Sequence, residues 1–528
     1  MSERFTPSGL PLKPVYTASD VDDSKIGLPG AYPFTRGIYP QMYRQRPWAM
    51  LQLTGYDLSE DTRKRVEFYT KQGIEHYQGN SSAHMVFDMP TLYGLDSDDP
   101  RIYDEIGRNG VHINSLNDME TLFRGWPLDR THTSLVSFAA TPVLLAMYVA
   151  MAQKQGVPLE KLVGSVNNCP LLGPLAENVL IFPLKPSFRL SVDVIKFCIK
   201  NLPGVNPFVL SIYDCREKGA NAIQELGISM ALGIALMQEC TKAGLKADEV
   251  ASKVLFFFNM ERHFFEEIAK LRAARRMWAK IMKEKFNAMD TKSQALRIYV
   301  HTASSSLQAQ EPLNNITRTS IQALAATLAG VQAIDIPAYD EALGIPTEQA
   351  AKVAVKTQRI LMHETGITDV ADPLGGSYYV ESLTNQLEQE AWNYLDRIEK
   401  LGGYIAAVES GFLTAEVEAS AYKFQDEVNR GERMIVGVNC FQSGERGPIN
   451  VFQYNDEAAS IAVARIRKLK SERDNMEVKR ALENVKAAAL NGQELMPVFV
   501  EAVKRYATVG EITNTLKEVF GVYRKSSL

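Results

Sequence analysis

The stretch Val254-Leu255-Phe256-Phe257-Phe258-Asn259 is a short apolar run that ends in a polar residue, and Leu296–Thr302 is a second run of this kind. Apolar runs of this length between longer segments are typical of strands buried in a parallel sheet. The segment between them, Phe264–Lys285, contains helical periodicity. The order strand, helix, strand predicts an α/β fold.

The same alternation extends outward in both directions. Further strand candidates are His84–Asp88, Val111–Ser115, Leu135–Ala139, Val163–Asn167, Phe208–Tyr213 and Val331–Ile336, and further helix candidates include Pro142–Lys154, Val192–Lys200, Ala222–Ala243 and Ser320–Leu328. Eight strand–helix repeats in about 250 residues predict a closed parallel (β/α)8 (TIM) barrel. A doubly wound open sheet is the competing topology, but it usually has fewer strands, and the sequence has neither a GxGxxG turn nor a GxxxxGK[ST] loop.

Regions of different character flank the predicted barrel, which we place at residues 48–382. Residues 1–47 are rich in Pro, Gly and Tyr and predict an extended arm. Residues 383–528 are mostly helical, charged and amphipathic, and predict a C-terminal helical region. A helix is also expected from Ser59 to Gln72, with Ser59 as its cap.

Composition excludes several classes of function. The 528 residues include 58 Lys plus Arg and 62 Asp plus Glu, a net charge of −4, whereas a general binder of nucleic acid or anionic membrane would be basic. Mean hydropathy is −0.16, and no apolar run reaches the length of a membrane span. The N-terminus lacks the apolar core of a secretion signal. The five cysteines are scattered without CxxC spacing, so neither a disulfide framework nor a zinc site is indicated, and we expect a cytoplasmic protein.

Several candidate strands end in small polar residues, where a barrel interior is normally filled by bulky apolar ones. These residues are Ser115, Ser137, Ser165, Asn167, Asn168, Ser211, Thr302 and Ser304 to Ser306. They predict a hydrophilic bore that a ligand could thread. The alternative, equally open at this point, is that they simply begin loops.

Four longer motifs carry more specific information. They are Thr35-Arg36-Gly37-Ile38-Tyr39-Pro40-Gln41-Met42-Tyr43-Arg44-Gln45-Arg46-Pro47-Trp48, Gly94-Leu95-Asp96-Ser97-Asp98-Asp99-Pro100-Arg101, Lys270-Leu271-Arg272-Ala273-Ala274-Arg275 and Asp372-Pro373-Leu374-Gly375-Gly376-Ser377-Tyr378-Tyr379-Val380-Glu381. With these motifs in this order, the chain resembles the large, substrate-binding subunit of the methylmalonyl-CoA mutase family. The similarity continues to Ala507-Thr508-Val509-Gly510-Glu511.

The resemblance implies a (β/α)8 barrel whose acyl-CoA substrate threads the bore, and an isomerase that catalyses an adenosylcobalamin-dependent radical 1,2-shift of the carbon skeleton. The family's cobalamin-binding module carries a DxHxxG signature whose His ligates cobalt. None of the seven histidines here lies in that pattern. The cobalt ligand is therefore expected from a separate small B12-binding subunit, as in isobutyryl-CoA and 2-hydroxyisobutyryl-CoA mutases, so this chain itself should hold no metal. The two-chain members also suggest homodimerisation of the large subunit within a heterotetramer, and a G-protein metallochaperone as a further partner.

The resemblance also assigns site residues by position. Tyr39, Met42, Arg46, Lys253 and Arg297 match positions around the CoA tail, and a guanidinium such as that of Arg46 suits a phosphate. Glu217 and Glu341 match two glutamates near the adenosyl group and corrin, where a carboxylate accepts hydrogen bonds from ribose hydroxyls. His301 falls where the family has a polar residue beneath the corrin. Tyr213 and Phe87 also match family residues.

The departures from the family pattern cluster at the substrate end. Glu177 stands where methylmalonyl-CoA mutases have an Arg that clamps the free carboxylate, and Asp214 replaces a His that hydrogen-bonds the thioester oxygen. Leu53 replaces a Tyr near the substrate carboxylate. Asn167 and Ser165 replace a Gln and a Thr.

These departures predict the substrate by charge. A buried Glu in place of an Arg disfavours a carboxylate substrate, because an unpaired buried charge costs about 3–5 kcal/mol. A substrate ammonium would satisfy both Glu177 and Asp214. The hypothesis is a mutase for an amino-substituted acyl-CoA, such as 3-aminobutyryl-CoA or 4-aminobutyryl-CoA.

Three alternatives stay open. The carboxylates could pair internally, Glu177 with Lys185 or Arg189 and Asp214 with Arg216, and the substrate would then be isobutyryl-CoA or a hydroxyacyl-CoA. Phe87 departs from the 2-hydroxyacyl mutases, which have an Asp there. Methylmalonyl-CoA is a weaker alternative, and an inactive paralogue that acts as a scaffold is the non-enzymatic one.

Overall fold

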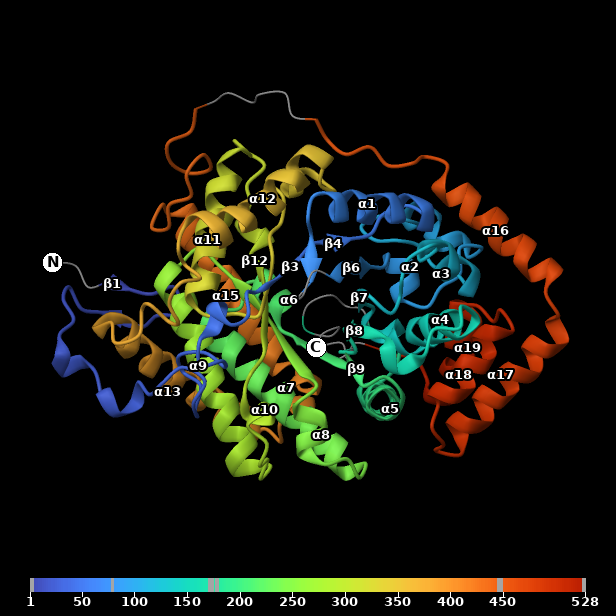
Figure 1. The fold of residues 1–528 in the computed structure, drawn as a ribbon, viewed down its shortest axis with the longest axis horizontal. Helices are drawn as coiled ribbons and strands as arrows, with labels where there is room; N and C mark the ends of the chain where they lie inside the picture. Colours follow the sequence, from blue (N-terminus) through green and yellow to red (C-terminus); the bar gives the residue numbers. More distant parts are fainter. Residues whose placement is uncertain (1–3, 77–79, 170–174, 176–179, 444–449, 525–528) are drawn as a thin grey trace. The chain divides into compact units, whose positions relative to one another are not determined.

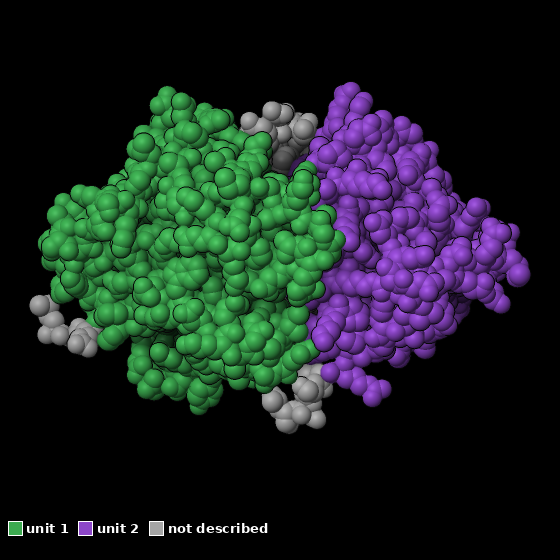
Figure 2. Space-filling view, turned by 90° about the horizontal axis from the view of Figure 1, so that it is seen from below, with its two compact units in different colours: residues 1–50, 210–452, 528 green, residues 51–209, 453–527 purple. Residues whose placement is uncertain are grey.

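The computed structural model describes residues 4–76, 80–169, 175, 180–443 and 450–524. These residues form two compact units (Figure 2): unit 1 comprises residues 1–50 and 210–452, and unit 2 comprises residues 51–209 and 453–527. Each unit contains a β-sheet with helices packed on it (Figure 1).

Unit 1 is built on a five-stranded sheet in the order β10-β11-β12-β13-β3. The pairs β11–β12 and β12–β13 are parallel. Its strands are β3 (Ala49–Leu51), β10 (Phe208–Ser211), β11 (Val254–Met260), β12 (Ile298–Thr302) and β13 (Ala333–Asp335), with β1 (Arg4–Phe5) and β2 (Pro11–Leu12) as a separate pair. Its helices are α6 (Tyr213–Glu217), α7 (Ala222–Lys242), α8 (Ala247–Ala251), α9 (Phe264–Lys280), α10 (Thr291–Gln294), α11 (Asn314–Leu328), α12 (Glu348–Glu364), α13 (Tyr378–Lys400), α14 (Tyr404–Glu409) and α15 (Phe412–Asn429).

Unit 2 is built on a sheet in the order β4-β6-β7-β8-β9, in which these neighbours are parallel and β5 pairs antiparallel with β6. Its strands are β4 (Leu53–Thr54), β5 (Glu75–His76), β6 (Asn80–Val86), β7 (Thr131–Val136), β8 (Val163–Val166) and β9 (Gly204–Asn206). Its helices are α1 (Ser59–Lys71), α2 (Met89–Leu92), α3 (Leu116–Leu122), α4 (Thr141–Lys154), α5 (Leu184–Asn201), α16 (Ala458–Glu472), α17 (Asn475–Leu490), α18 (Met496–Lys504) and α19 (Val509–Phe520).

The fold class predicted from the sequence is confirmed: the protein is α/β, and parallel strands alternate with helices in the order of a (β/α)8 barrel. Among the described residues the hydrogen-bonded ladders form one sheet in each unit and no single closed sheet. None of the described helices combines the length and apolar character that a bilayer span requires.

Seven of the eight predicted strands overlap an observed strand, and Val111–Ser115 is the error. Val111 makes only an isolated bridge to Phe87. The chain then turns away, because Ser115 caps α3 and accepts a hydrogen bond from the amide of Asn117. The strands that the sequence pattern missed are all short, two or three residues each: β1, β2, β3, β4, β5 and β9. Strands of this length are too short to show a period.

The predicted helices are largely confirmed, with one correction at a cap. Ser59 is the first residue of α1 and not its cap; the cap position is Leu58, which makes no side-chain hydrogen bond. Helix α4 packs against both β7 and α18, so its residues 141–152 are buried. Burial on several sides explains why this helix is apolar all round.

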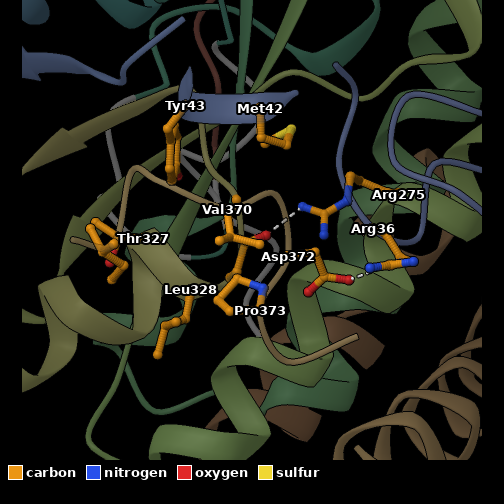
Figure 3. Close-up of a pocket in the computed structure, with 12 residues that line it drawn as sticks. Arg36, Met42, Tyr43, Arg275, Thr327, Leu328, Val370, Asp372 and Pro373 are labelled. Atoms are coloured by element: carbon orange, nitrogen blue, oxygen red, sulfur yellow. Dashed lines mark hydrogen bonds and ion pairs between the residues drawn. The ribbon is translucent and has the colours of Figure 1, made fainter. Parts of the chain in front are cut away.

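Three of the family motifs meet at buried ion pairs in unit 1. Arg272 of α9 donates two hydrogen bonds of 2.8 Å to Asp372 and also pairs with Glu381. Arg36 donates to the same aspartate at 2.9 Å (Figure 3). Arg275 donates to the carbonyl oxygens of residues 34, 35 and 329. The cavity between these side chains has a volume of about 10 Å³, enough for one water at most. It is too small for a substrate, so these ion pairs stabilise the packing of the three motifs.

Candidate functional site

Basic side chains gather at the amino end of the unit 1 sheet. Lys253 directly precedes β11, and Arg297 directly precedes β12. Arg46 donates a hydrogen bond of 3.3 Å to the hydroxyl of Tyr39. The pKa of Arg297 is lowered to about 10, chiefly by burial; Tyr39 opposes this shift by charge, and Arg46 contributes to it. The predicted CoA residues Tyr39, Arg46 and Arg297 therefore act on one another in the folded chain.

Met42 stabilises the turn of the N-terminal arm that carries Tyr39 and Arg46. It is buried, adopts a positive φ of 42°, and its sulfur accepts a hydrogen bond from the amide of Tyr39 at 3.4 Å. A Cβ at Gly37 would lie 2.4 Å from that sulfur, so glycine is required there for the turn to close. Met42 thus shapes the arm, while Tyr39 and Arg46 carry its polar groups.

An aromatic stripe runs along one face of this sheet. Tyr213 stacks on Phe257 with ring centroids 4.9 Å apart, and Phe257 stacks on Tyr299 at 4.3 Å. The ring of His301 packs edge-on against Tyr213 at 5.0 Å. Alternate strand residues point the other way, toward α9, as shown by Phe256 against Trp278. The stripe therefore lies on the face turned away from α9.

A hydrogen-bonded chain closes the carboxyl end of the sheet. The hydroxyl of Tyr213 donates to Ser304 at 3.1 Å, and the Ser304 hydroxyl donates to Glu341 at 2.6 Å. Burial, together with the carboxylates around it, raises the pKa of Tyr213 well above its usual range, so Tyr213 stays protonated as a donor. Burial also raises the pKa of Glu341, although His301 and Ser304 oppose this.

Glu217 lies at the same end and faces a pocket. It accepts hydrogen bonds from the Ser305 amide at 2.6 Å and from the side-chain amide of Asn259. Burial raises the pKa of Glu217 to about 7 despite these hydrogen bonds, and Glu261 and Asp214 add to the shift by charge. The pocket has a volume of about 480 Å³ and is also lined by Ser305 and Arg262.

Asp214 lies next to Tyr213 at the start of α6. Its carboxylate accepts a hydrogen bond of 3.2 Å from Ser211. The sequence suggests Arg216 as an alternative partner of Asp214. In the structure Arg216 donates a hydrogen bond to Glu267 at 2.9 Å and lies 3.6 Å from Glu225. The guanidinium of Arg216 is thus directed to the buried carboxylates of α7 and α9.

The remaining predicted site residues belong to unit 2. In its parallel sheet, Leu53 pairs with His84, His84 with Ser134, and Ser134 with Ser165. Residues in register in a parallel sheet point to one face, so Leu53 and Ser165 share a face, and the hydroxyls of Ser134 and Ser165 lie 2.9 Å apart.

Two further residues follow the strands of unit 2. Asn167 lies one residue beyond β8 and is only 4 % exposed, and its Oδ1 has no hydrogen-bond partner among the described residues. A buried, unsatisfied acceptor of this kind is consistent with a ligand contact. Phe87 follows β6 and is buried. Glu177 lies outside the described residues.

The residues at the carboxyl end of the unit 1 sheet suit the adenosyl group. Glu217 and Glu341 offer carboxylate oxygens, which accept hydrogen bonds from ribose hydroxyls, and Glu217 opens on a pocket large enough for a small ligand group. The described residues contain no cluster of three or more His, Cys, Asp or Glu side chains that could hold a metal ion.

Sequence reasoning missed three residues that support this site. Asn259 binds Glu217, and Phe257 and Tyr299 form the aromatic stripe. Ser304, which binds Glu341, is one of the small polar residues that the sequence indicates, and Asn259 ends a predicted strand, so the same pattern could have indicated Asn259 too. Phe257 and Tyr299 carry no signal in the sequence, because an apolar strand residue gives no indication of which face it occupies.

The raised pKa of Glu217 predicts a pH-dependent stability. The unfolded chain ionises Glu217 near 4.5 and the folded chain near 7, so between these values the folded state holds a proton that the unfolded state has lost. Wild-type stability should therefore fall as pH rises through this window. We expect Glu217→Gln to be more stable than wild type by about 1–3 kcal/mol at pH 8 and by much less at pH 5.

Urea unfolding of the chain at the two pH values measures this difference. Glu239→Gln is the matched control, since Glu239 is partly exposed on α7 and pairs with Lys242 at 2.7 Å. A gain for Glu217→Gln that is equal at pH 5 and pH 8 would contradict the prediction.

Comparison with known proteins gives consistent matches over nearly the whole chain. The family model for methylmalonyl-CoA mutase matches residues 5–522. The 2-hydroxyisobutanoyl-CoA mutase large subunit of Aquincola tertiaricarbonis is 41% identical over 530 residues, covering 99% of this chain and 93% of that protein. The methylmalonyl-CoA mutase of Rhizobium meliloti (strain 1021) is 40% identical over 524 residues, covering 98% and 72%. The human mitochondrial methylmalonyl-CoA mutase is 37% identical over 521 residues, covering 98% and 69%.

Proposed function

Because the chain belongs to the methylmalonyl-CoA mutase family, we propose that it rearranges the carbon skeleton of an amino-substituted acyl-CoA. It is an acyl-CoA mutase, an intramolecular transferase whose family uses adenosylcobalamin. Two substrate pairs fit the proposal. One is 3-aminobutyryl-CoA with 2-aminoisobutyryl-CoA, and the other is 4-aminobutyryl-CoA with 3-aminoisobutyryl-CoA.

The observation that supports this substrate class is the charge around Tyr213. The groups that act most strongly on its pKa by charge are all carboxylates, namely Glu217, Glu341 and Asp214. Asp214 and Glu261 also raise the pKa of Glu217 by their charge, so several carboxylates act on this end of the sheet. A substrate ammonium would be favoured there, because it forms charge-assisted hydrogen bonds with carboxylates.

The negative charges of these carboxylates would repel a substrate that carries a free carboxylate, such as those of the methylmalonyl-CoA mutases. A second carboxylate brought next to Asp214 would be repelled, and the Arg that pairs with it in methylmalonyl-CoA mutases is replaced by Glu177. We therefore expect succinyl-CoA and methylmalonyl-CoA to be poor substrates.

The chain's own residues would bind and seclude the substrate. Arg46, Arg297 and Tyr39 would hold the CoA tail at the amino end of the unit 1 sheet, and the aromatic stripe would exclude water along the acyl chain. Glu217 and Glu341 would hold the adenosyl group by its ribose hydroxyls. Radical chemistry is what adenosylcobalamin supplies when bound.

We also propose a separate small subunit that binds cobalamin. The support is the name of the Aquincola relative, a large subunit, which this chain matches over 93% of its length. A heterotetramer with two large chains and an interaction with a G-protein metallochaperone remain part of this proposal.

A hydroxyacyl-CoA is the second candidate substrate, because the relative that is 41% identical is named a 2-hydroxyisobutanoyl-CoA mutase. A hydroxyl would also donate a hydrogen bond to Asp214. The feature that counts against a hydroxyacyl group is Phe87, which is buried and which stands where the resemblance gives the 2-hydroxyacyl mutases an Asp.

A substrate panel tests the proposal. The chain, its small subunit and adenosylcobalamin are incubated with 3-aminobutyryl-, 4-aminobutyryl-, 3-hydroxybutyryl-, butyryl- and succinyl-CoA, and isomers are separated by chromatography with mass detection. We expect turnover of an aminoacyl-CoA. We expect Asp214→Asn to lower kcat/KM for it about 10- to 150-fold, because a hydrogen bond to a charged group contributes about 1.5–3 kcal/mol.

Glu177→Gln should act in the same direction. Glu239→Gln should retain the wild-type rate, because the Glu239 side chain is partly exposed near the end of α7 and pairs with Lys242. Turnover of butyryl- or hydroxybutyryl-CoA without any amine product would overturn the amine proposal and leave the mutase class intact.

A further inference from the structure

His301 lies near the carboxyl end of β12, on the same face as the aromatic stripe. Arg297, Tyr299 and His301 are spaced two residues apart, so their side chains share one face of the sheet. Arg297 interacts by charge with Tyr39 and Arg46 at the amino end of the sheet. Tyr299 stacks on Phe257. A strand rises about 3.3 Å per residue, which places His301 roughly 13 Å beyond Arg297. A CoA thioester held at Arg297 would run along this stripe toward His301.

The structure fixes the tautomer of the His301 ring. Its Nδ1 lies 2.7 Å from the carbonyl oxygen of Thr302. A carbonyl oxygen only accepts, so Nδ1 must carry the proton and donate it. In the neutral ring Nε2 then has a free lone pair and is an acceptor only. The ring is 3 % exposed and is held edge-on against Tyr213.

The environment keeps this ring neutral and leaves Nε2 available. Burial lowers the pKa of His301, although Glu341 and Asp214 oppose this by charge. Among the described residues no hydrogen bond to Nε2 is formed; the contacts of the ring are those to Thr302 and Tyr213. His301 is in register with Asn259 of β11 and with Asp335 of β13. These residues lie on the face of the sheet that is turned away from α9, which is the face of the aromatic stripe.

We propose that Nε2 of His301 is the hydrogen-bond acceptor that selects acyl groups bearing an N–H or O–H donor, a specificity role that rests on the proposed function. An acyl group without a donor would leave this lone pair unsatisfied, and a buried unsatisfied polar group costs about 1–3 kcal/mol. His301 and Asp214 would therefore act together: the first accepts from a neutral or charged donor, and the second favours the charged one.

Two variants separate the two ring nitrogens. In His301→Asn the amide can reach the position of Nδ1 and keep the bond to Thr302, but nothing reaches the position of Nε2. In His301→Gln the longer side chain can place an acceptor near the position of Nε2. Binding of 3-aminobutyryl-CoA and of butyryl-CoA to the complex of large and small subunits, without adenosylcobalamin, is measured by titration calorimetry.

We expect the wild-type complex to bind the amine more tightly than butyryl-CoA. His301→Asn should reduce that preference about tenfold, and His301→Gln should retain most of it. An unchanged preference in His301→Asn would overturn the inference while leaving the amine proposal standing.

A second readout does not depend on substrate. Selective ¹⁵N labelling of histidine and long-range ¹H–¹⁵N correlation distinguish a protonated from an unprotonated ring nitrogen. His301 is assigned by its loss in His301→Gln. We expect a protonated Nδ1 and a bare Nε2. A protonated Nε2 in the substrate-free chain would overturn the inference whatever the substrate proves to be. A bare Nε2 in a wild-type complex that shows no preference for the amine over butyryl-CoA would count against both the inference and the amine proposal.

Discussion

Lys270→Met is expected to destabilise the protein by about 3–5 kcal/mol, a large part of the stability of a typical domain. The ammonium of Lys270 is fully buried, and it donates to Glu225 at 2.7 Å, to the carbonyl oxygen of Asn259 at 2.6 Å, and to Glu267. Both glutamates are also fully buried. Removing the cation leaves two buried carboxylates, for which Arg216 is the one remaining ion-pair partner among the residues that the structure describes.

Urea unfolding of the variant measures the loss, and a second substitution tests its cause. In Lys270→Met/Glu225→Gln one of the two buried charges is gone, so part of the stability should return. Lys280→Met is the control on the same helix, because Lys280 is half-buried and Arg276 still pairs with its partner Glu388. A double variant no more stable than Lys270→Met would show that packing, and not charge, accounts for the loss.

Arg46→Gln is expected to weaken the binding of acyl-CoA about 10- to 100-fold. A guanidinium forms charge-assisted hydrogen bonds with phosphate, each of which contributes about 1.5–3 kcal/mol, and Arg46 acts with Tyr39 and Arg297 at the amino end of the sheet. Titration calorimetry of the large and small subunits with butyryl-CoA measures the affinity.

The comparison ligand is butyryl-pantetheine, which lacks the nucleotide and its phosphates. Its affinity should be the same for wild type and Arg46→Gln, since the thioester end of the site is unchanged. Arg44→Gln is the matched control, because Arg44 lies in the same turn but is exposed. Equal losses with both ligands would mean that Arg46 supports the fold of the arm and does not bind phosphate.

Local pattern was sufficient for most of the fold. Strands such as β11 and β12 could be predicted because they are apolar runs bounded by helical periodicity, which is a property of neighbouring residues. The polar residues at the strand ends likewise indicated a site, and Ser304 is now seen to bind Glu341. The split strand β3–β4 was missed because five residues are too few to show a period.

The sequence by itself determined the α/β class, the family and the residue types of the site, because these depend on local spacing and on motifs read in order. Only the tertiary structure decided which partner each polar group has. Arg272 meets Asp372 and Lys270 meets Glu225, pairs that are 100 and 45 residues apart in the chain. The proton position on His301 depends on the carbonyl group of Thr302. These contacts follow from packing between distant segments, and burial then sets their energies and pKa values, which no local pattern encodes.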